Sequence, residues 1–154
     1  MNSYSWATYS YGTSAASVSK YNLNDHLTTL EPEDDAAHVN WGGGWRMPTE
    51  KEWMELIKYT DQEVIVSEGG VRMTLGMNFT NKTDGEKVIF LPTGTHVDGG
   101  SHSMNSNAYY WSSTLSTNYE DGQARSFSFT DKGVFSIGDT NRPAGLTVRP
   151  VQDK

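Results

Sequence analysis

The clearest hydrophobic pattern in the chain is helical and begins at Trp53. Trp53 and the apolar residues three and four positions after it share one face of a helix. Thr49 and Glu52 form a capping box ahead of them, in which each side chain bonds the backbone N–H of the other residue. The pattern therefore predicts a helix over residues 50–59.

A second short helix is predicted over residues 31–40. Pro32 stands near its beginning and three acidic residues follow it, and both residue types are favoured in the first turn of a helix. The run Trp41-Gly-Gly-Gly-Trp45 ends the pattern, because three glycines are costly inside a helix.

After residue 70 the pattern changes to short runs of β-branched and aromatic residues, which predict strands. The runs cover residues 71–77, 87–91, 109–113, 124–130, 134–137 and 146–151. Asp84-Gly85 and Asp131-Lys132-Gly133 predict tight turns between neighbouring strands. The remaining polar stretches predict long loops over residues 92–108, 115–123 and 138–145. The fold class is therefore α+β, with two short helices followed by a twisted antiparallel sheet with long loops.

The composition adds an unusual core. Hydrophobic residues make up only 35% of the 154 residues, but aromatic residues reach 12%, with five Trp and eight Tyr. Residues 1–30, called the lead-in below, alternate aromatic rings with small polar residues. We interpret the lead-in as an irregular segment that lies across the domain and is anchored by its rings.

The charge and the residue types exclude several classes of protein. A net charge of −7 would repel a polyanion, so nucleic acid is not expected as a partner. The chain has no cysteine, which excludes disulfide scaffolds and thiolate chemistry. No apolar run approaches the roughly 20 residues of a membrane helix, so no membrane insertion by this segment is expected.

Three ordered blocks of the sequence resemble the landmarks of the Fibrobacter succinogenes major paralogous domain. They are residues 34–53 around Trp41-Gly-Gly-Gly-Trp45, the motif Tyr110-Trp-Ser-Ser-Thr114, and the motif Gly145-Leu-Thr-Val-Arg-Pro-Val151. This family is similar in fold to C-type lectins, to formylglycine-generating enzymes and to ligand-binding variable proteins of diversity-generating retroelements. The resemblance covers about residues 31–151 and implies a C-type lectin-like fold.

The resemblance also implies where the protein works. The family occurs in cell-envelope proteins of gut Bacteroidetes, so we expect a secreted or cell-surface protein. Family members usually carry an earlier strand that pairs with the C-terminal strand, and nothing before Tyr4 can supply it. We therefore expect residues 1–154 to form a single domain that is a fragment of a longer protein. The edge of strand 146–151 would then be open to self-association.

Catalysis is not expected. Formylglycine-generating enzymes depend on cysteines, which are absent, and Ser112 and Ser113 lack the spacing of a serine nucleophile with its base. We interpret Trp111 as a core residue and the neighbouring hydroxyl groups as backbone-bonding. No cofactor is expected. Calcium stays open as an alternative, because oxygen ligands stand at Asn118, Glu120, Asp121 and Asp139.

The predicted recognition surface lies in the loops around residues 109–113. These loops are rich in Tyr, Ser and Asn, the residue types of antibody binding loops. The candidate ligand-binding residues are Asn105, Asn107, Tyr109, Tyr110, Asn118, Tyr119, Asp121, Gln123 and Arg125. Because side chains alternate along a strand, a buried Trp111 would leave Tyr110 as the exposed ring.

These observations predict a non-catalytic ligand-binding module presented at the bacterial cell surface. It would recognise a glycan or a protein through its C-terminal loops. The alternative is a structural or adhesin-subunit domain without a small ligand.

Overall fold

The computed structural model describes residues 4–69, 73–117 and 122–153. Its helices are α1 (Ala36–Trp41) and α2 (Glu50–Tyr59), with one turn of 3-10 helix at Ala15–Ser17. The strands are β1 (Trp45–Arg46), β2 (Thr60–Val66), β3 (Thr74–Asn81), β4 (Lys87–Phe90), β5 (Thr95–Val97), β6 (Gly100–His102), β7 (Asn107–Leu115), β8 (Gln123–Thr130), β9 (Phe135–Asn141) and β10 (Val151–Gln152).

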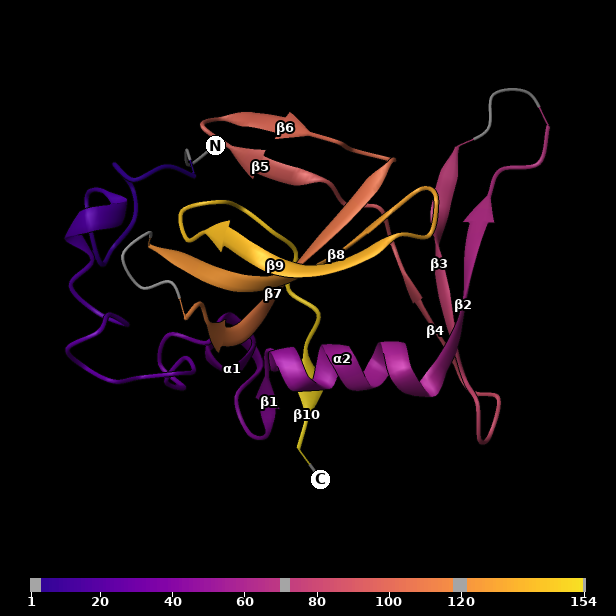
Figure 1. Ribbon diagram of the computed structural model, residues 1–154, viewed down its shortest axis with the longest axis horizontal. Helices are drawn as coiled ribbons and strands as arrows, with labels where there is room; N and C mark the ends of the chain where they lie inside the picture. Colours follow the sequence, from indigo (N-terminus) through magenta and orange to yellow (C-terminus); the bar gives the residue numbers. More distant parts are fainter. Residues whose placement is uncertain (1–3, 70–72, 118–121, 154) are drawn as a thin grey trace.

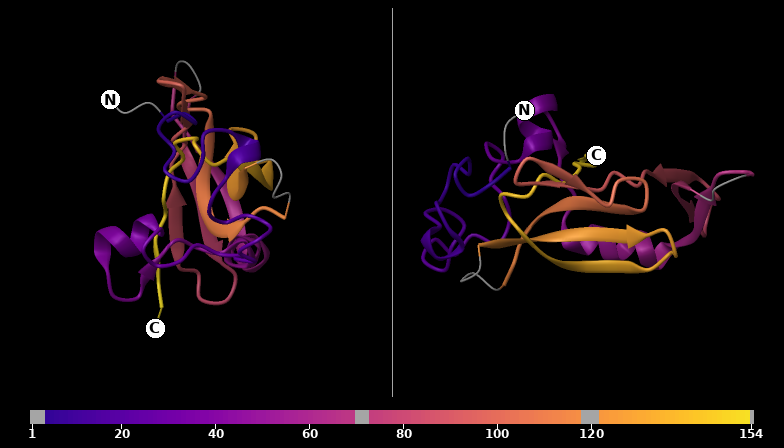
Figure 2. Two further views of the ribbon diagram at one scale, coloured as in Figure 1. Left: turned by 90° about the vertical axis from the view of Figure 1, so that its left-hand side faces the viewer. Right: turned by 90° about the horizontal axis from the view of Figure 1, so that it is seen from above.

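The strands form four antiparallel sheets. Two have three strands, in the orders β2-β3-β4 and β7-β8-β9, and two are pairs, β1 with β10 and β5 with β6. Helix α2 runs beneath the β7-β8-β9 sheet and leads directly into β2 (Figure 1). The lead-in and the β2-β3 hairpin lie at opposite ends of the long axis, in Figure 1 and in the right-hand view of Figure 2. The architecture is therefore α+β, as the sequence predicts.

Aromatic rings fill the core where α2 meets the two larger sheets. Trp53 of α2 stacks on Phe127 of β8 with ring centroids 4.6 Å apart. Phe79 and Phe90, from the other sheet, complete this cluster together with Tyr110 of β7. Stacked and edge-to-face ring pairs stabilise a core beyond the area that they bury. This packing explains how a chain with few aliphatic residues forms a hydrophobic core.

The predicted capping box is present at the start of α2. Thr49 Oγ1 accepts the N–H of Glu52, and Glu52 Oε2 accepts the N–H of Thr49 at 2.8 Å. Arg46 donates to both carboxylate oxygens of Glu52, at 2.8 and 2.7 Å, and to Asp153 near the end of the chain. Arg46 therefore holds the first turn of α2 and the C-terminal strand together.

Acid should weaken this junction. The hydrogen bonds from Arg46 lower the pKa of the Glu52 carboxyl to about 2, against the opposing effect of burial. A carboxyl with a lowered pKa stabilises the fold above its unfolded value of about 4.3, and this stabilisation is lost as the pH falls through the folded value. We expect Glu52→Gln to flatten the decline of unfolding free energy between about pH 4.5 and 2.

Urea unfolding at a series of pH values measures this decline. Glu55→Gln, on the exposed face of the same helix, is the matched control and should keep the wild-type slope. An equally steep decline in Glu52→Gln would show that Glu52 does not carry the effect.

The predicted helix 50–59 is confirmed at both ends. The helix predicted over residues 31–40 begins later, at Ala36, because Asp35 and not Pro32 supplies the cap. The Asp35 carboxylate accepts the N–H groups of Ala37 and His38 and, across the loop, that of Met47. Both tight turns are confirmed, since they join β3 to β4 and β8 to β9.

Several predicted strands and loops are wrong in extent. The stretch 92–108 is not one loop, because it contains the β5-β6 hairpin. Strand β9 continues to Asn141 and removes part of the loop predicted at 138–145. The strand predicted over 146–151 is reduced to β10, which pairs with β1 inside the chain. Residue 147 instead bridges β7 through a single parallel pair with Tyr110.

In the described part of the chain, no helix is long and apolar enough to cross a membrane.

Candidate functional site

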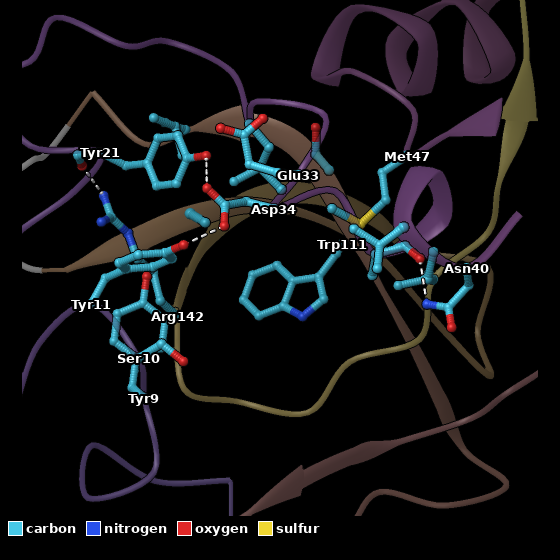
Figure 3. A pocket seen from close by; sticks show the side chains of 17 residues that line it. Tyr9, Ser10, Tyr11, Tyr21, Glu33, Asp34, Asn40, Met47, Trp111 and Arg142 are labelled. Carbon is cyan, nitrogen blue, oxygen red and sulfur yellow. Dashed lines mark hydrogen bonds between the residues drawn. The ribbon is translucent and has the colours of Figure 1, made fainter. Parts of the chain in front are cut away.

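A cavity of about 510 Å³ opens between the lead-in, α1 and the β7-β8-β9 sheet. Its volume lies in the range of small-molecule sites, about 300–1,000 Å³. The lining is mostly aromatic and apolar, with a few polar groups among the rings (Figure 3). The lining includes Tyr9, Tyr11, Asp34, Asn40, Trp111 and Arg142. We call this site the aromatic cavity.

Trp111 places its indole ring in the middle of the aromatic cavity (Figure 3). It reaches the cavity because the first residues of β7 alternate, with Asn107, Tyr109 and Trp111 half-buried on one face. Ala108 and Tyr110 point the other way, into the core cluster, and are buried. Trp111 is only half-buried, so its ring remains accessible from the cavity.

The prediction that Tyr110 is exposed and Trp111 buried is therefore wrong. Tyr110 is only 3% exposed and packs against Phe90 at 5.3 Å between ring centroids. Its hydroxyl donates to the carbonyl oxygen of Leu91 at 2.8 Å and accepts the N–H of the same residue. The predicted alternation along the strand is present, but the two faces are exchanged. The phenol suits the buried face because it finds a backbone partner there.

Asp34 holds the lead-in against the domain. Its carboxylate accepts hydrogen bonds from the hydroxyl groups of Tyr11 and Tyr21, and from the Lys20 ammonium at 2.5 Å. Lys20 also lies over the Tyr21 ring, 4.9 Å from its centroid. Tyr21 is fully buried. The expected role of lead-in rings as anchors is thus confirmed for Tyr21.

Arg142 fixes the same segment from the other side. Its guanidinium donates to the carbonyl oxygens of Lys20 at 3.2 Å and of Tyr21 at 2.7 Å, and its Nε donates to that of Gln123. A planar guanidinium suits such a set of convergent acceptors. The lead-in therefore forms a fixed wall of the aromatic cavity, with two charged side chains holding it.

The ionisation of the wall follows from these contacts. Burial raises the pKa of the Asp34 carboxyl, but the hydrogen bonds from Lys20, Tyr11 and Tyr21 outweigh it, so the net pKa is lowered. Burial, reinforced by the Asp34 hydrogen bond, raises the pKa of Tyr21 to about 12. Asp34 is therefore ionised at neutral pH, while Tyr21 stays protonated and donates to it.

The described residues of the predicted recognition surface do not line one common site. Arg125 is held by Glu50 at 2.5 Å and by Asp139 at 3.1 Å, which gives it a structural ion-pair role. Gln123 reaches Asn141 across the β8-β9 pair. Asn107 donates to the hydroxyl of Tyr109 at 3.3 Å at the start of β7. Asn105 lies in a turn with a φ of 63° beside Lys132, away from the aromatic cavity. Asn118, Tyr119 and Asp121 lie outside the described residues.

Sequence reasoning misses most of the aromatic cavity. Of its key residues, the sequence predicts Trp111 as a core residue and the lead-in rings as anchors, and it assigns none of them to a ligand site. The alternating rings of the lead-in are the available signal, since Tyr9, Tyr11 and Tyr21 all line the cavity. In the sequence pattern Asp34 is only a helix-start acid, and Arg142 carries no signal of its own.

No metal centre is apparent in the part of the chain that the structure describes, where no three His, Asp or Glu side chains are placed to hold a metal ion. Comparison with protein-family models, with curated proteins and with solved structures finds no match. The geometry of the aromatic cavity is therefore the basis for a functional proposal.

Proposed function

We propose that the chain is a non-catalytic module that binds a carbohydrate in the aromatic cavity. The observation that carries this proposal is the position of Trp111, whose half-buried indole stands in a cavity of about 510 Å³ instead of in the core. Aromatic side chains that line a concave site are typical contacts of small-molecule ligands.

The chemistry of the lining suits a sugar. One face of a pyranose ring carries C–H groups that pack on aromatic rings, while its hydroxyl groups need hydrogen-bond partners. Trp111, Tyr9 and Tyr11 supply rings around the cavity, and Asn40 and Glu33 supply polar groups at its edge. A site with apolar walls and a few convergent polar groups is the usual form of a small-molecule site.

Two features support a binding role over a catalytic one. Asp34, the most buried carboxylate at the cavity, accepts three hydrogen bonds and has a lowered pKa. General acids and bases instead need pKa values near the working pH. Arg142 is engaged with three backbone carbonyl groups and so has a structural task.

The resemblance to the Fibrobacter succinogenes major paralogous domain fits this proposal. Its three blocks lie far apart in the sequence, but residues of each line the cavity, among them Met47, Trp111 and Val148. A C-type lectin-like module on a secreted or cell-surface bacterial protein would place such a cavity where extracellular glycans are met. Fold alone does not define a ligand, so the cavity and not the resemblance carries the proposal.

A glycan array, probed with the purified chain with and without a calcium chelator, tests the proposal. We expect binding to a restricted set of glycans that persists in chelator, since the described part of the cavity has no cluster of calcium ligands. Binding that vanishes with chelator would assign recognition to the calcium alternative. The absence of any binding would favour the structural or adhesin-subunit alternative.

Trp111→Ala is then expected to lower the affinity for the glycan found by the array by roughly 30-fold, because losing a central aromatic contact typically costs about 2 kcal/mol of binding free energy. Isothermal titration calorimetry measures the change. Tyr109→Ala is the matched control, since Tyr109 lies two residues earlier on the same strand face but does not line the cavity. A loss of affinity in Tyr109→Ala but not in Trp111→Ala would place the ligand on the surface predicted from the sequence and not in the aromatic cavity.

A further inference from the structure

The cations at the aromatic cavity are already engaged within the chain. Arg142 lines the cavity, but its Nε, Nη1 and Nη2 atoms all donate to backbone carbonyl groups. Lys20 lies behind the lining, where its ammonium group contacts the carboxylates of Asp34 at 2.5 Å and Glu31 at 2.7 Å. Among the described residues, a ligand in the cavity therefore meets no ammonium or guanidinium group that still needs a partner.

Carboxylates outnumber the cations on the same wall. Asp34 and Glu33 line the cavity, and Glu31 joins them around Lys20. The Glu33 side chain is 68% exposed and approaches Lys20 only to 3.8 Å, so its charge is weakly compensated. Three carboxylates face two cations here, and the whole chain carries a net charge of −7. The electrostatic potential at the cavity is therefore negative.

The polar atoms that remain for a ligand are uncharged. The indole nitrogen of Trp111 lies in the cavity and donates to no described residue (Figure 3). Asn40 uses its Nδ2 group to donate to the carbonyl oxygen of Ala36 at 2.6 Å, which leaves its Oδ1 atom as an acceptor. A neutral donor and a neutral acceptor beside aromatic rings match hydroxyl groups, because a hydroxyl both donates and accepts.

We infer that the aromatic cavity selects uncharged sugars and excludes sugars that carry a carboxylate or sulfate group. The inference rests on the proposed function, since it specifies which carbohydrates the cavity accepts. An acidic sugar would lose the hydration of its anionic group and would gain no charged donor in return, which is unfavourable for a buried anion. Repulsion by Asp34 and Glu33 weakens its binding further.

An array that pairs neutral oligosaccharides with the matching uronic acids tests this selectivity. Oligosaccharides of glucose, galactose and mannose serve as the neutral members, and each pair differs only in a CH2OH or a carboxylate group. We expect the neutral member of at least one pair to bind, and its acidic counterpart to bind about tenfold more weakly or worse at neutral pH.

The two proposals fail in different ways on this array. An acidic member that binds as tightly as its neutral partner, with both lost in Trp111→Ala, would overturn the selectivity and keep the cavity as the binding site. A wild-type chain that binds no member of any pair would overturn the proposed function together with the selectivity.

Reversing one charge at the rim tests the cause of the selectivity. Glu33→Lys should reduce the difference in affinity within a bound pair to about threefold, because an ammonium group with available donors replaces a carboxylate. Glu68→Lys is the matched control, since it makes the same change of charge at an exposed position between β2 and β3, at the opposite end of the long axis (Figure 2). Isothermal titration calorimetry measures both members of the pair. An equal reduction in both variants, or none in Glu33→Lys, would overturn the assignment to the cavity wall.

Removing the indole N–H tests the uncharged donor. Trp111→Phe keeps an aromatic ring in the cavity and should lower the affinity for the neutral sugar by roughly fivefold, the usual effect of losing one hydrogen bond. Trp41→Phe is the control, because Trp41 is exposed on α1 and does not line the cavity. Wild-type affinity in Trp111→Phe would overturn the role of the indole N–H.

Discussion

Replacing Phe127 with alanine is expected to destabilise the protein by about 3–5 kcal/mol, the usual cost of deleting a buried aromatic ring. Phe127 is fully buried and stacks on Trp53 of α2. It also lies within 6.3 Å, centroid to centroid, of Phe79 in one sheet and Phe135 in the other. No single neighbour can fill the space of this ring without leaving its own contacts.

Thermal and urea unfolding followed by circular dichroism measure the effect. A loss of this size corresponds to a fall in melting temperature of roughly 10 °C for a chain of this length. Phe127→Leu should lose less of the free energy of unfolding, since leucine keeps most of the volume of the phenylalanine side chain. Val134→Ala, at an exposed position in the β8-β9 turn, should stay within about 0.5 kcal/mol of wild type. Equal stability of Phe127→Ala and Val134→Ala would show that the ring cluster is not the core.

The parts of the fold that the sequence predicts well are those that local chemistry determines. The Thr49–Glu52 capping box specifies the start of α2 within four residues. Gly85 and Gly133 adopt φ values of 76° and 73°, so the turns around them need glycine. Each of these signals acts between neighbours in the chain, and the structure retains them.

Strand β2 is absent from the sequence prediction because its boundary carries no local signal. Thr60 follows the last residue of α2 directly, with no glycine or proline between helix and strand. The strand is specified by its seven-residue pairing with β3, which the sequence does not display. Its inner face also carries the polar Thr60 and Gln62, which weaken the alternation that would predict a strand.

The faces of β7 cannot be assigned from alternation alone. The pattern groups Tyr109 with Trp111 and Tyr110 with Ser112, and either pair could face inward. The choice depends on α2 and β4, which supply Trp53 and Phe90 as partners for Tyr110. Trp111 becomes a candidate site residue for the same reason, since the opposite face meets the lead-in. The aromatic cavity joins residues 9 to 148 and so has no signature in any one segment.

Removing the Asp34 carboxylate should detach the lead-in while the rest of the fold persists. Asp34→Ala leaves Tyr11 and Tyr21 without their shared acceptor and removes the shortest of the Lys20 contacts to carboxylates. Removing a carboxylate that accepts three hydrogen bonds leaves its donors without their shared acceptor and weakens the attachment of the lead-in. Because these contacts bind the lead-in and not the core, we expect the loss to appear as local opening.

Hydrogen exchange followed by mass spectrometry separates local from global opening. Amides of residues 9–22 should exchange much faster in Asp34→Ala, while those of α2 and β8 keep the wild-type rate. Glu33→Ala is the matched control, because this neighbouring side chain is exposed and contacts Lys20 only at 3.8 Å. Exposed ion pairs of this kind contribute little to stability, so hydrogen exchange in Glu33→Ala should resemble that of the wild type.

The same variant connects the lead-in to ligand binding. Because the lead-in is a wall of the site, Asp34→Ala should lower the affinity for the glycan. The effect would be indirect, since the wild-type Asp34 carboxylate is already engaged by three donors. The wild-type protein should show a matching loss of glycan affinity at acidic pH. The Asp34 pKa is lowered on folding, so its stabilisation is present above the unfolded value and disappears as the pH falls through the folded one. Faster exchange with unchanged affinity would show that the ligand contacts Trp111 from outside the lead-in wall.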